Sequence, residues 1–289
     1  MAILDGKLTS DKILTGVKDE IERLKTDKIN QPSMAILLVG TNPASESYIR
    51  AKTRSCKKSG IKSNVFRYDD GISSEDLLMQ IESLNKSSYD GYIVQLPLPD
   101  HINKDLIINA ISDDKDIDGF TPSNFGKMAL GQESFRPATA YGITKLIESY
   151  DIETNGKHVV VVGRSNIVGK PISIMLGNDF GIGRATVTSC DINTPKALLM
   201  EETKKADIVI VAVGKPNLLT SEMIKEGCVV IDVGINRLES GKLVGDCDFE
   251  GLSKKASWIT PVPGGVGPMT IAGLILNTMK SWKIKNNLI

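Results

Sequence analysis

Residues 157–171 read KHVVVVGRSNIVGKP, and this stretch predicts the fold of the second half of the chain. Four consecutive valines are typical of a strand that is buried on both faces, as in a parallel sheet. Gly163 ends this strand and Gly169 begins a helix, a geometry in which backbone N–H groups and a helix N-terminus receive a pyrophosphate. The spacing differs from G-x-G-x-x-G, so a plain strand-to-helix turn stays open on this stretch alone.

Three further apolar strands follow this stretch: RATVTSC (184–190), ADIVIVAVG (206–214) and CVVIDVG (228–234). The last two end in Gly214 and Gly234. Ligands of open α/β sheets bind just past the carboxyl ends of the strands. Three strands that end in glycine therefore favour a cofactor crevice over a plain turn.

The first half of the chain repeats the β-α-β order. Residues 34–40, 63–68 and 92–96 indicate buried strands, and residues 45–60 and 73–87 indicate helices, the first with a serine at its start and a glycine at its end. Repeated β-α-β order implies a mostly parallel sheet covered by helices.

A loop-rich break over 112–142 separates the two series. We expect an α/β fold with two α/β domains and mostly parallel sheets, the second domain being a Rossmann-like dinucleotide-binding domain. The expected domains are 1–140 and 141–270, with a C-terminal helix over 271–289 that packs back on the first.

Composition limits the class of protein. In 289 residues, Lys+Arg and Asp+Glu both count 35, which argues against nucleic acid or an anionic membrane as the main partner. The apolar runs are too short to span a bilayer, and the N-terminus does not resemble a signal peptide. Four cysteines without C-x-x-C spacing and only two histidines predict reduced thiols, a cytoplasmic location and no metal site.

Two polar features of the first half can each be explained without a catalytic role. Tyr48 and Lys52 lie four residues apart, so they share one helix face, where a solvated surface pair is the more common outcome. Gln95 follows an apolar strand and precedes PLP, where a cap is more common than a catalytic group. Neither feature decides its own role.

The loop DKDIDG (114–119) invites a calcium-loop interpretation, since acids stand at its first, third and fifth positions. Phe125 occupies the twelfth position, where such loops carry glutamate, so we reject a metal site. Asp118 then remains as a loop carboxylate that is suited to accept N–H groups of a heterocycle.

The stretch TPVPGGVGPMTIA (260–272) is dense in proline and glycine and leads into a helix with Thr270 near its start. Such density indicates backbone that approaches a flat ligand closely. The candidate contacts are Gly264, Gly265 and Pro268.

The choice of nicotinamide cofactor stays open on these residues. Arg164 follows the turn glycine and could pair with the 2′-phosphate of NADP. Asp191 ends the second strand of this half, where an acidic side chain accepts the ribose 2′-hydroxyl of NAD and repels a phosphate.

Taken together, these motifs resemble the bifunctional methylenetetrahydrofolate dehydrogenase/cyclohydrolase family from end to end. The matching stretches occur in the family's order: VGTNPASESYIRAK, YIVQLPLP, KDIDGF, RPATAYG, VVVVGRSNIVGKP, VIDVGIN, GDCDF and TPVPGGVGPMT. GRSNIVGKP and PGGVGPMT are highly specific.

The resemblance implies oxidation of 5,10-methylenetetrahydrofolate by NADP and hydrolysis of the methenyl product to 10-formyltetrahydrofolate at the same site, in one-carbon metabolism and purine biosynthesis. It implies a folate-binding first domain, an active-site cleft between the domains, and a homodimer. Lys52 is implied as the proton shuttle, Gln95 as its partner and Tyr48 as the group that orients the folate. Ser45 and Asp118 are implied as further folate contacts, and the implied cofactor contacts are Gly163, Arg164, Ser165 and Ile235, with Asp191 nearby.

This chain departs from the family pattern at two places. Ala140 stands where the family usually has a second proline, for which we expect a slightly looser loop. Asp191, Ile192 and Asn193 follow Cys190 where the family has His-Ser and a basic residue, which weakens the preference for NADP and leaves NAD possible. The alternatives are a single-activity dehydrogenase that uses NAD, a two-domain keto-acid reductase, and a non-catalytic folate or nucleotide sensor.

Overall fold

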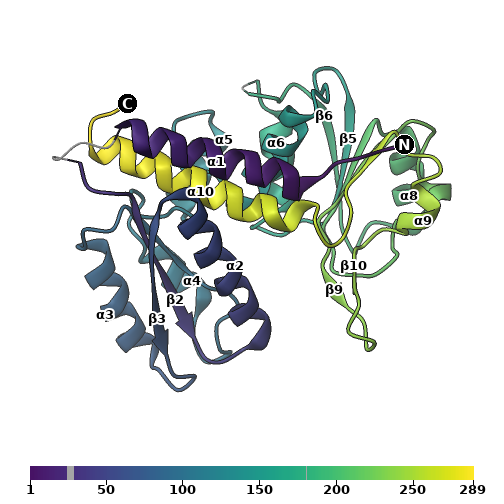
Figure 1. The fold of residues 1–289 in the computed structure, drawn as a ribbon. Helices are drawn as coiled ribbons and strands as arrows, with labels where there is room; N and C mark the ends of the chain where they lie inside the picture. The colour runs from purple at the N-terminus through teal and green to yellow at the C-terminus, as the bar shows by residue number, and fades with distance from the viewer. Residues whose placement is uncertain (25–28, 180) are drawn as a thin grey trace. The chain divides into compact units, whose positions relative to one another are not determined.

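The computed structural model describes residues 1–24, 29–179 and 181–289, which divide into two units (Figure 1). Unit 1 contains Met1–Ser10, Ala129–Gln132 and Thr139–Gly273. Unit 2 contains Asp11–Met128, Glu133–Ala138 and Leu274–Ile289. Both units are α/β with mostly parallel sheets, which confirms the predicted fold class.

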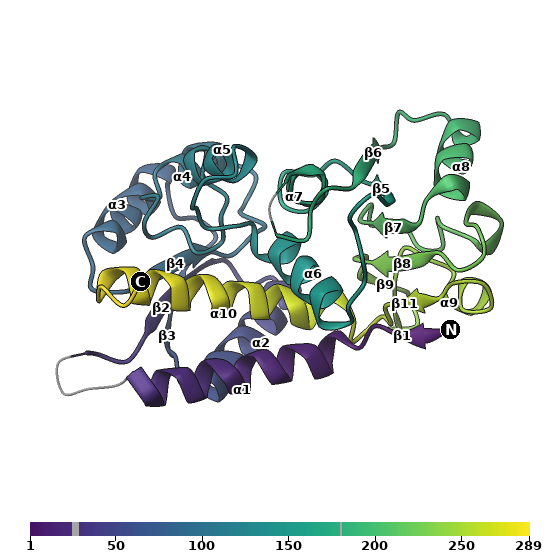
Figure 2. The ribbon, with the colours of Figure 1, turned by 90° about the horizontal axis from the view of Figure 1, so that it is seen from above.

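Unit 1 is built on a six-stranded parallel sheet in the order β1-β11-β8-β7-β5-β6, which can be followed in Figure 2. The strands are β1 (Ala2–Ile3), β5 (His158–Val162), β6 (Thr186–Cys190), β7 (Ile208–Val211), β8 (Val229–Asp232) and β11 (Trp258–Ile259). The other elements of this unit are α6 (Ala138–Ser149), α7 (Gly169–Gly177), α8 (Lys196–Lys205), η1 (Ser221–Met223), α9 (Phe249–Leu252) and the antiparallel pair β9 (Asn236–Arg237) and β10 (Leu243–Val244).

The valine run of β5 forms the centre of this sheet. Val159, Val160, Val161 and Val162 are all at most 2% exposed, because β5 is paired on both edges and covered on both faces. Val160 and Val162 pack with Val209 and Val211 of β7 and with Leu199 of α8 in one core cluster. The apolar pattern therefore predicts the strand correctly.

Unit 2 is built on a three-stranded parallel sheet in the order β3-β2-β4. Its strands are β2 (Ser33–Val39), β3 (Lys62–Tyr68) and β4 (Gly91–Val94), and its helices are α1 (Gly6–Leu24), α2 (Pro43–Ser59), α3 (Ser74–Asn85), α4 (Lys104–Asn109), α5 (Pro122–Ala129) and α10 (Val266–Lys285). The first residues of α1 and of α10 and the last of α5 belong to unit 1. On one face, Leu37 and Tyr92 pack with Leu77 of α3 and Ile107 of α4. Met34 contacts Cys56 of α2, with the two sulfur atoms 3.3 Å apart.

The start of α2 differs from the prediction. We expected Ser45 to cap this helix, but the N-cap is Asn42, whose side chain accepts the N–H groups of Ala44 and Ser45 at 2.9 and 3.4 Å. Pro43 occupies the first turn, where no N–H partner is needed. Ser45 thus lies inside the helix and is only 2% exposed, whereas Gly60 ends the helix with positive φ as expected.

The segment 112–142 is less loop-like than predicted. It contains α5 and the beginning of α6. Both helices start beside a proline, Pro122 at the first position of α5 and Pro137 directly before α6. Proline suits the first turn of a helix as well as a loop, and its local signal does not distinguish the two.

The last helix begins earlier than predicted. The expected start was at Thr270 or Ile271, but α10 begins at Val266 and includes Gly267 and Pro268 in its first turn. The first N–H groups of a helix have no partner in the helix, so Pro268 costs no hydrogen bond there. The dense loop is therefore confined to residues 260–265.

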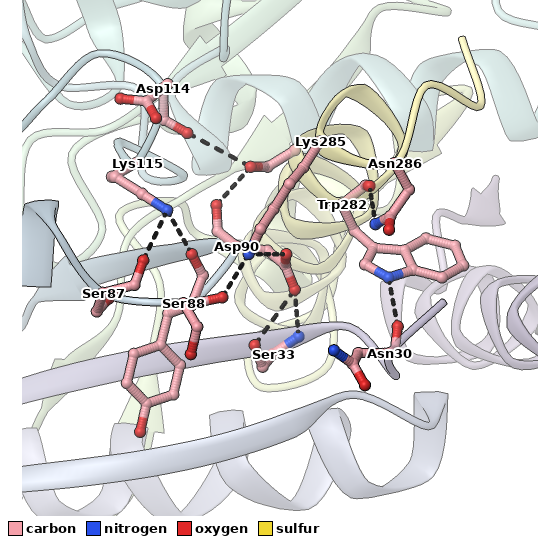
Figure 3. A network of polar contacts seen from close by, with 12 residues as sticks. Asn30, Ser33, Ser87, Ser88, Asp90, Asp114, Lys115, Trp282, Lys285 and Asn286 are labelled. Atoms are coloured by element: carbon pink, nitrogen blue, oxygen red, sulfur yellow. Dashed lines mark hydrogen bonds and ion pairs between the residues drawn. The ribbon is translucent and has the colours of Figure 1, made fainter. Parts of the chain in front are cut away.

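The last turns of α10 belong to unit 2 and are tied to its other segments by polar contacts (Figure 3). The indole Nε1 of Trp282 donates to the carbonyl oxygen of Asn30 at 2.7 Å, and Lys285 Nζ lies 3.2 Å from the Asp90 carboxylate. Asp90 also accepts the N–H of Ser33 at 2.7 Å. These bonds fix the C-terminal helix beside strands that lie far away in the sequence.

Two further features concern membrane spans and thiols. Of the helices that lie in the described part of the chain, none is long and apolar enough to cross a membrane. All four cysteines are free and buried.

Candidate active site

Helix α2 presents Tyr48 and Lys52 in different surroundings. Lys52 is 8% exposed, whereas Tyr48 is 42% exposed. Burial raises the pKa of the Tyr48 hydroxyl. Lys52 is therefore not part of a solvated surface pair. Charged side chains are seldom buried without a partner, so a partner for Lys52 is expected.

The partner of Lys52 is Gln95. Lys52 Nζ donates to Gln95 Oε1 at 3.0 Å in a buried contact. The backbone N–H of Gln95 continues the strand pairing by donating to Leu37 of β2 at 2.8 Å, and its Nε2 donates to the carbonyl oxygen of Leu96 at 2.7 Å. Because Nε2 is engaged by Leu96, the acceptor Oε1 faces the lysine.

The negative charge of Asp118 acts on this lysine. Burial lowers the pKa of Lys52, and the negative charge of Asp118 raises it in part. Burial raises the pKa of the Asp118 carboxyl to about 6, which the positive charge of Lys52 lowers and the charge of Asp116 raises. Burial thus moves the pKa values of both groups toward neutral pH, where each group can hold or release a proton.

The loop that carries Asp118 is organised by Asp116, which is 1% exposed. Its carboxylate accepts the backbone N–H groups of Gly119 at 2.9 Å, Phe120 at 3.1 Å and Thr121 at 2.8 Å, and the side-chain amide of Asn124 at 3.0 Å. The acid at the third position of the rejected calcium loop is therefore engaged by N–H donors. Across residues 1–24, 29–179 and 181–289, no group of three or more His, Cys, Asp or Glu side chains could hold a metal ion.

Gly163 follows the last residue of β5, and Gly169 is the first residue of α7. Gly163 has φ +117°, and a Cβ there would lie 2.2 Å from the carbonyl oxygen of Ala212. A Cβ on Gly169 would lie 1.8 Å from the carbonyl oxygen of Gly163. Ser165 Oγ accepts the N–H of Val168 at 3.2 Å within this turn. The turn therefore needs glycine for its own backbone packing, and it leads directly into α7.

Arg164 and Asp191 contact each other. The guanidinium Nη1 of Arg164 lies 3.3 Å from Asp191 Oδ2, and its Nη2 donates to the carbonyl oxygen of Ser189 at 2.6 Å. The other carboxylate oxygen of Asp191 accepts the N–H of Asn193 at 3.0 Å. By their charges, the two side chains act in opposite directions on the choice of cofactor, and the fold pairs them across the ends of β5 and β6.

Two buried carboxylates that sequence reasoning did not single out join the loops after β7 and β8. Asp246 Oδ2 accepts the N–H groups of Val213 at 2.7 Å and Gly214 at 2.9 Å, and its Oδ1 accepts the Asn236 amide at 2.8 Å. Asp232 in turn accepts the N–H of Asp246 at 2.9 Å. An acid inside the apolar strand 229–232 and the acids of GDCDF were the available signals.

The proline- and glycine-rich loop packs against the N-terminal segment of the chain. The N–H of Lys7 donates to the carbonyl oxygen of Gly264 at 2.9 Å, and a Cβ on Gly6 would lie 1.8 Å from that of Gly265. Contact with the chain's own backbone thus accounts for part of the glycine content. Ile235 is 44% exposed and lies beside Gly267.

The predicted residues therefore fall into two groups. Lys52, Gln95 and Asp118 are brought together in unit 2, and Tyr48 and Ser45 lie on the same helix as Lys52. The other predicted residues belong to unit 1, where Arg164 and Asp191 form a pair. These unit 1 residues are Gly163, Arg164, Ser165, Asp191, Ile235, Gly264, Gly265 and Pro268.

Comparison with known proteins finds a family model for each half of the chain. Residues 4–118 match a family model described as the catalytic domain of tetrahydrofolate dehydrogenase/cyclohydrolase, and residues 137–286 match its NAD(P)-binding domain. The chain is 55% identical to bifunctional protein FolD 1 of Geobacter metallireducens over 98% of both chains. It is 51% identical to bifunctional protein FolD of Campylobacter jejuni, over 99% of this chain and 100% of the relative.

Solved structures agree in fold. The crystal structure of the bifunctional methylenetetrahydrofolate dehydrogenase/cyclohydrolase from Campylobacter jejuni has a TM-score of 0.94 at 51% identity, covering 99% of both chains. The Trypanosoma brucei dehydrogenase-cyclohydrolase, solved with NADP cofactor and an inhibitor, has a TM-score of 0.93 at 32% identity, covering 99% of this chain and 98% of that one. With both family models matched and relatives alike over nearly the full length, the chain belongs to the tetrahydrofolate dehydrogenase/cyclohydrolase family.

Proposed function

We propose that this chain is a bifunctional enzyme, which oxidises 5,10-methylenetetrahydrofolate with NADP and hydrolyses the methenyl product to 10-formyltetrahydrofolate. The observation that carries the proposal is the buried Lys52, bonded to Gln95 at 3.0 Å and electrostatically coupled to Asp118. Folate chemistry is assigned to residues 1–140, with the helix 271–289, and cofactor binding to residues 141–270. The names of the bifunctional relatives favour two activities over one.

In the hydrolytic step, Lys52 handles protons. Water adds to the methenyl carbon, the bond from that carbon to the ring nitrogen breaks, and the formyl group stays on the other nitrogen. A neutral Lys52 Nζ accepts one proton of the water and passes it to the departing nitrogen, and the second proton leaves to solvent. Burial lowers the pKa of Lys52 and so supplies the neutral form that this step requires.

The other predicted folate-binding residues hold the substrate. Gln95 keeps Lys52 Nζ in place through Oε1. Asp118 accepts N–H groups of the pterin, the half-exposed Tyr48 orients the folate, and Ser45 supports the same helix face. Gly264, Gly265 and Pro268 are proposed as further folate contacts.

The cofactor contacts are proposed in unit 1. When bound, NADP supplies the acceptor for the hydride that leaves the methylene carbon. The turn Gly163–Ser165 and the exposed guanidinium of Arg164 suit a phosphate-bearing ligand at a strand end, and Ile235 offers an apolar contact. Asp191 already engages Arg164, so a 2′-phosphate has to compete with this carboxylate.

The function is tested by following methenyl-folate absorbance with the purified protein. We expect it to rise with 5,10-methylenetetrahydrofolate and NADP, to rise less with NAD at the same low concentration, and to decay faster than the spontaneous rate when methenyl-folate is supplied. Dehydrogenation without accelerated hydrolysis would support a single-activity enzyme. Absence of both activities would reject the proposal.

We propose a homodimer, as is typical of the family that the sequence resembles. Light scattering at micromolar concentration is expected to give twice the mass of one chain. A mass of one chain would reject the dimer.

We also propose a cytoplasmic location. Four buried free cysteines suit a reducing compartment. Fractionation of cells that express the chain should recover it with cytoplasmic markers, and recovery outside that fraction would reject the location.

A further inference from the structure

Asn277 is a buried polar side chain of α10 that none of the proposed steps uses. It is 1% exposed, and its Nδ2 donates to two carbonyl oxygens, those of Ile117 and Arg136, each at 2.8 Å. The two acceptors lie 160 and 141 residues away in the sequence. Both N–H groups of the amide are therefore engaged by separate segments of unit 2.

The two segments that Asn277 joins lie on either side of Asp118. Ile117 directly precedes Asp118, and the N–H of Ala138 donates to the Asp118 carbonyl oxygen at 3.2 Å. Gly119 has φ +73°, and a Cβ there would lie 2.5 Å from the carbonyl carbon of Arg136. The segments 117–119 and 136–138 are thus in contact, and Asn277 bonds to both.

Asp116 and Asn277 restrain this loop from different directions. Asp116 collects the N–H groups that follow Asp118, while Asn277 holds the carbonyl group that precedes it. With the backbone restrained on both sides, the Asp118 carboxyl keeps a defined position relative to Lys52. Without Asn277, segment 117–119 would keep its bonds to Asp116 and to Ala138 but would lose the bond that holds the Ile117 carbonyl oxygen.

We propose that Asn277 is a positioning residue for the folate site, which locks segment 117–119 against segment 136–138 and so holds the Asp118 carboxyl beside Lys52. The inference rests on the proposed function of Asp118 as the pterin acceptor. It assigns to the C-terminal helix a specific part in substrate recognition.

The rival interpretation is that Asn277 contributes stability and nothing more. Ser281 is a matched control, since it lies one turn later on α10, is 6% exposed and donates from Oγ to the carbonyl oxygen of Asp90. Ser281→Ala also removes a buried side-chain-to-backbone bond of this helix. Its Oγ also donates to the carbonyl oxygen of Asp114 at 3.4 Å, at the start of the loop 114–119, and not to the segments 117–119 and 136–138 that Asn277 joins.

The experiment compares Asn277→Ala with Ser281→Ala by three measurements: the carboxyl pKa of Asp118 by NMR without ligand, the KM for methylenetetrahydrofolate, and the Kd for NADP. In Asn277→Ala we expect the Asp118 pKa to fall from about 6 toward its ordinary value as the loop opens to water. We expect the KM to rise about tenfold with kcat less affected, and the Kd for NADP to stay unchanged. Ser281→Ala should change none of the three.

A folded Asn277→Ala protein with wild-type Asp118 pKa and folate KM would overturn the inference, as would equal changes in Ser281→Ala. Should Asn277→Ala fail to fold, Asn277→Ser, which keeps a hydroxyl donor, is judged by the same readings. The NMR measurement needs no substrate. If the pKa moves as expected in a protein without folate activity, the proposed function fails while the positioning of Asp118 by Asn277 stands.

Discussion

Lys52 and Arg164 each lie beside one aspartate, and the two pairs differ in burial. Lys52 is 8% exposed, whereas the Arg164 side chain is 48% exposed and its partner Asp191 23% exposed. Burial brings the pKa values of Lys52 and Asp118 toward each other, which suits the acid–base role proposed for that pair. The pair of Arg164 and Asp191 stays open to water and to a competing anion. The same two kinds of charge are therefore buried in one unit, where we propose proton transfer, and exposed in the other, where we propose ligand selection.

The largest expected effect is at the buried pair. Lys52→Met should lower the rate of hydrolysis of supplied methenyl-folate by at least about a hundredfold, because no other group takes over the proton transfer. The decay of methenyl absorbance measures it, with NADP affinity expected to stay unchanged. Lys57→Met, an exposed change on the same helix, is the control and should hydrolyse normally. Wild-type hydrolysis by Lys52→Met would show that the buried pair is not the proton-transfer device.

The second effect concerns the carboxyl of the buried pair. Asp118→Ala should weaken folate binding by roughly ten- to a hundredfold, since one charge-assisted hydrogen bond contributes roughly 1.5–3 kcal/mol. Calorimetry measures the affinity, and circular dichroism checks that the fold is intact. Asp114→Ala removes an exposed acid of the same loop and should bind folate as the wild type does. A folate affinity of Asp118→Ala equal to that of the wild type would show that this carboxyl does not bind the pterin.

The third effect is at the exposed pair. We predict that NADP is preferred over NAD by a margin that Asp191 limits. Arg164→Ala should reduce the ratio of the two kcat/KM values about tenfold, and Asp191→Ser should increase it about fivefold, because water screens both charges. Steady-state rates with each cofactor at low concentration give the ratio. Faster turnover of NAD by the wild type would make Asp191 the dominant determinant.

The smallest expected effect is a change in the pKa values of the buried pair, which is measured without any substrate. Lys52 lowers the pKa of Asp118, so Lys52→Met should raise that pKa above about 6, and Asp118→Asn should lower the pKa of Lys52 further. NMR titration of the carboxyl carbon and of the lysine side chain follows both changes. An Asp118 pKa that stays or falls in Lys52→Met would contradict the coupling of the two groups.

Much of the fold was predictable because its signals are local. The valines of β5, the alternation of strands and helices, and the glycine after α2 depend on residues close in sequence, and each prediction is confirmed. The starts of α2 and α10 were misplaced. At Pro43 and Pro268, a first helical turn and a loop have the same local signature, and only the hydrogen bonds formed nearby separate them.

The sequence by itself determined which residue types are available for chemistry: a lysine on a helix, an amide after a strand, and carboxylates in the loop 114–119 and after β6. Only the tertiary structure decided that Lys52 is buried against Gln95, that Arg164 and Asp191 face each other, and that Asn277 bonds to both segments around Asp118. The reason is physical. Burial, and with it the pKa of a side chain, depends on segments that lie tens to hundreds of residues away, and the strand order that brings them together is not written in any local pattern.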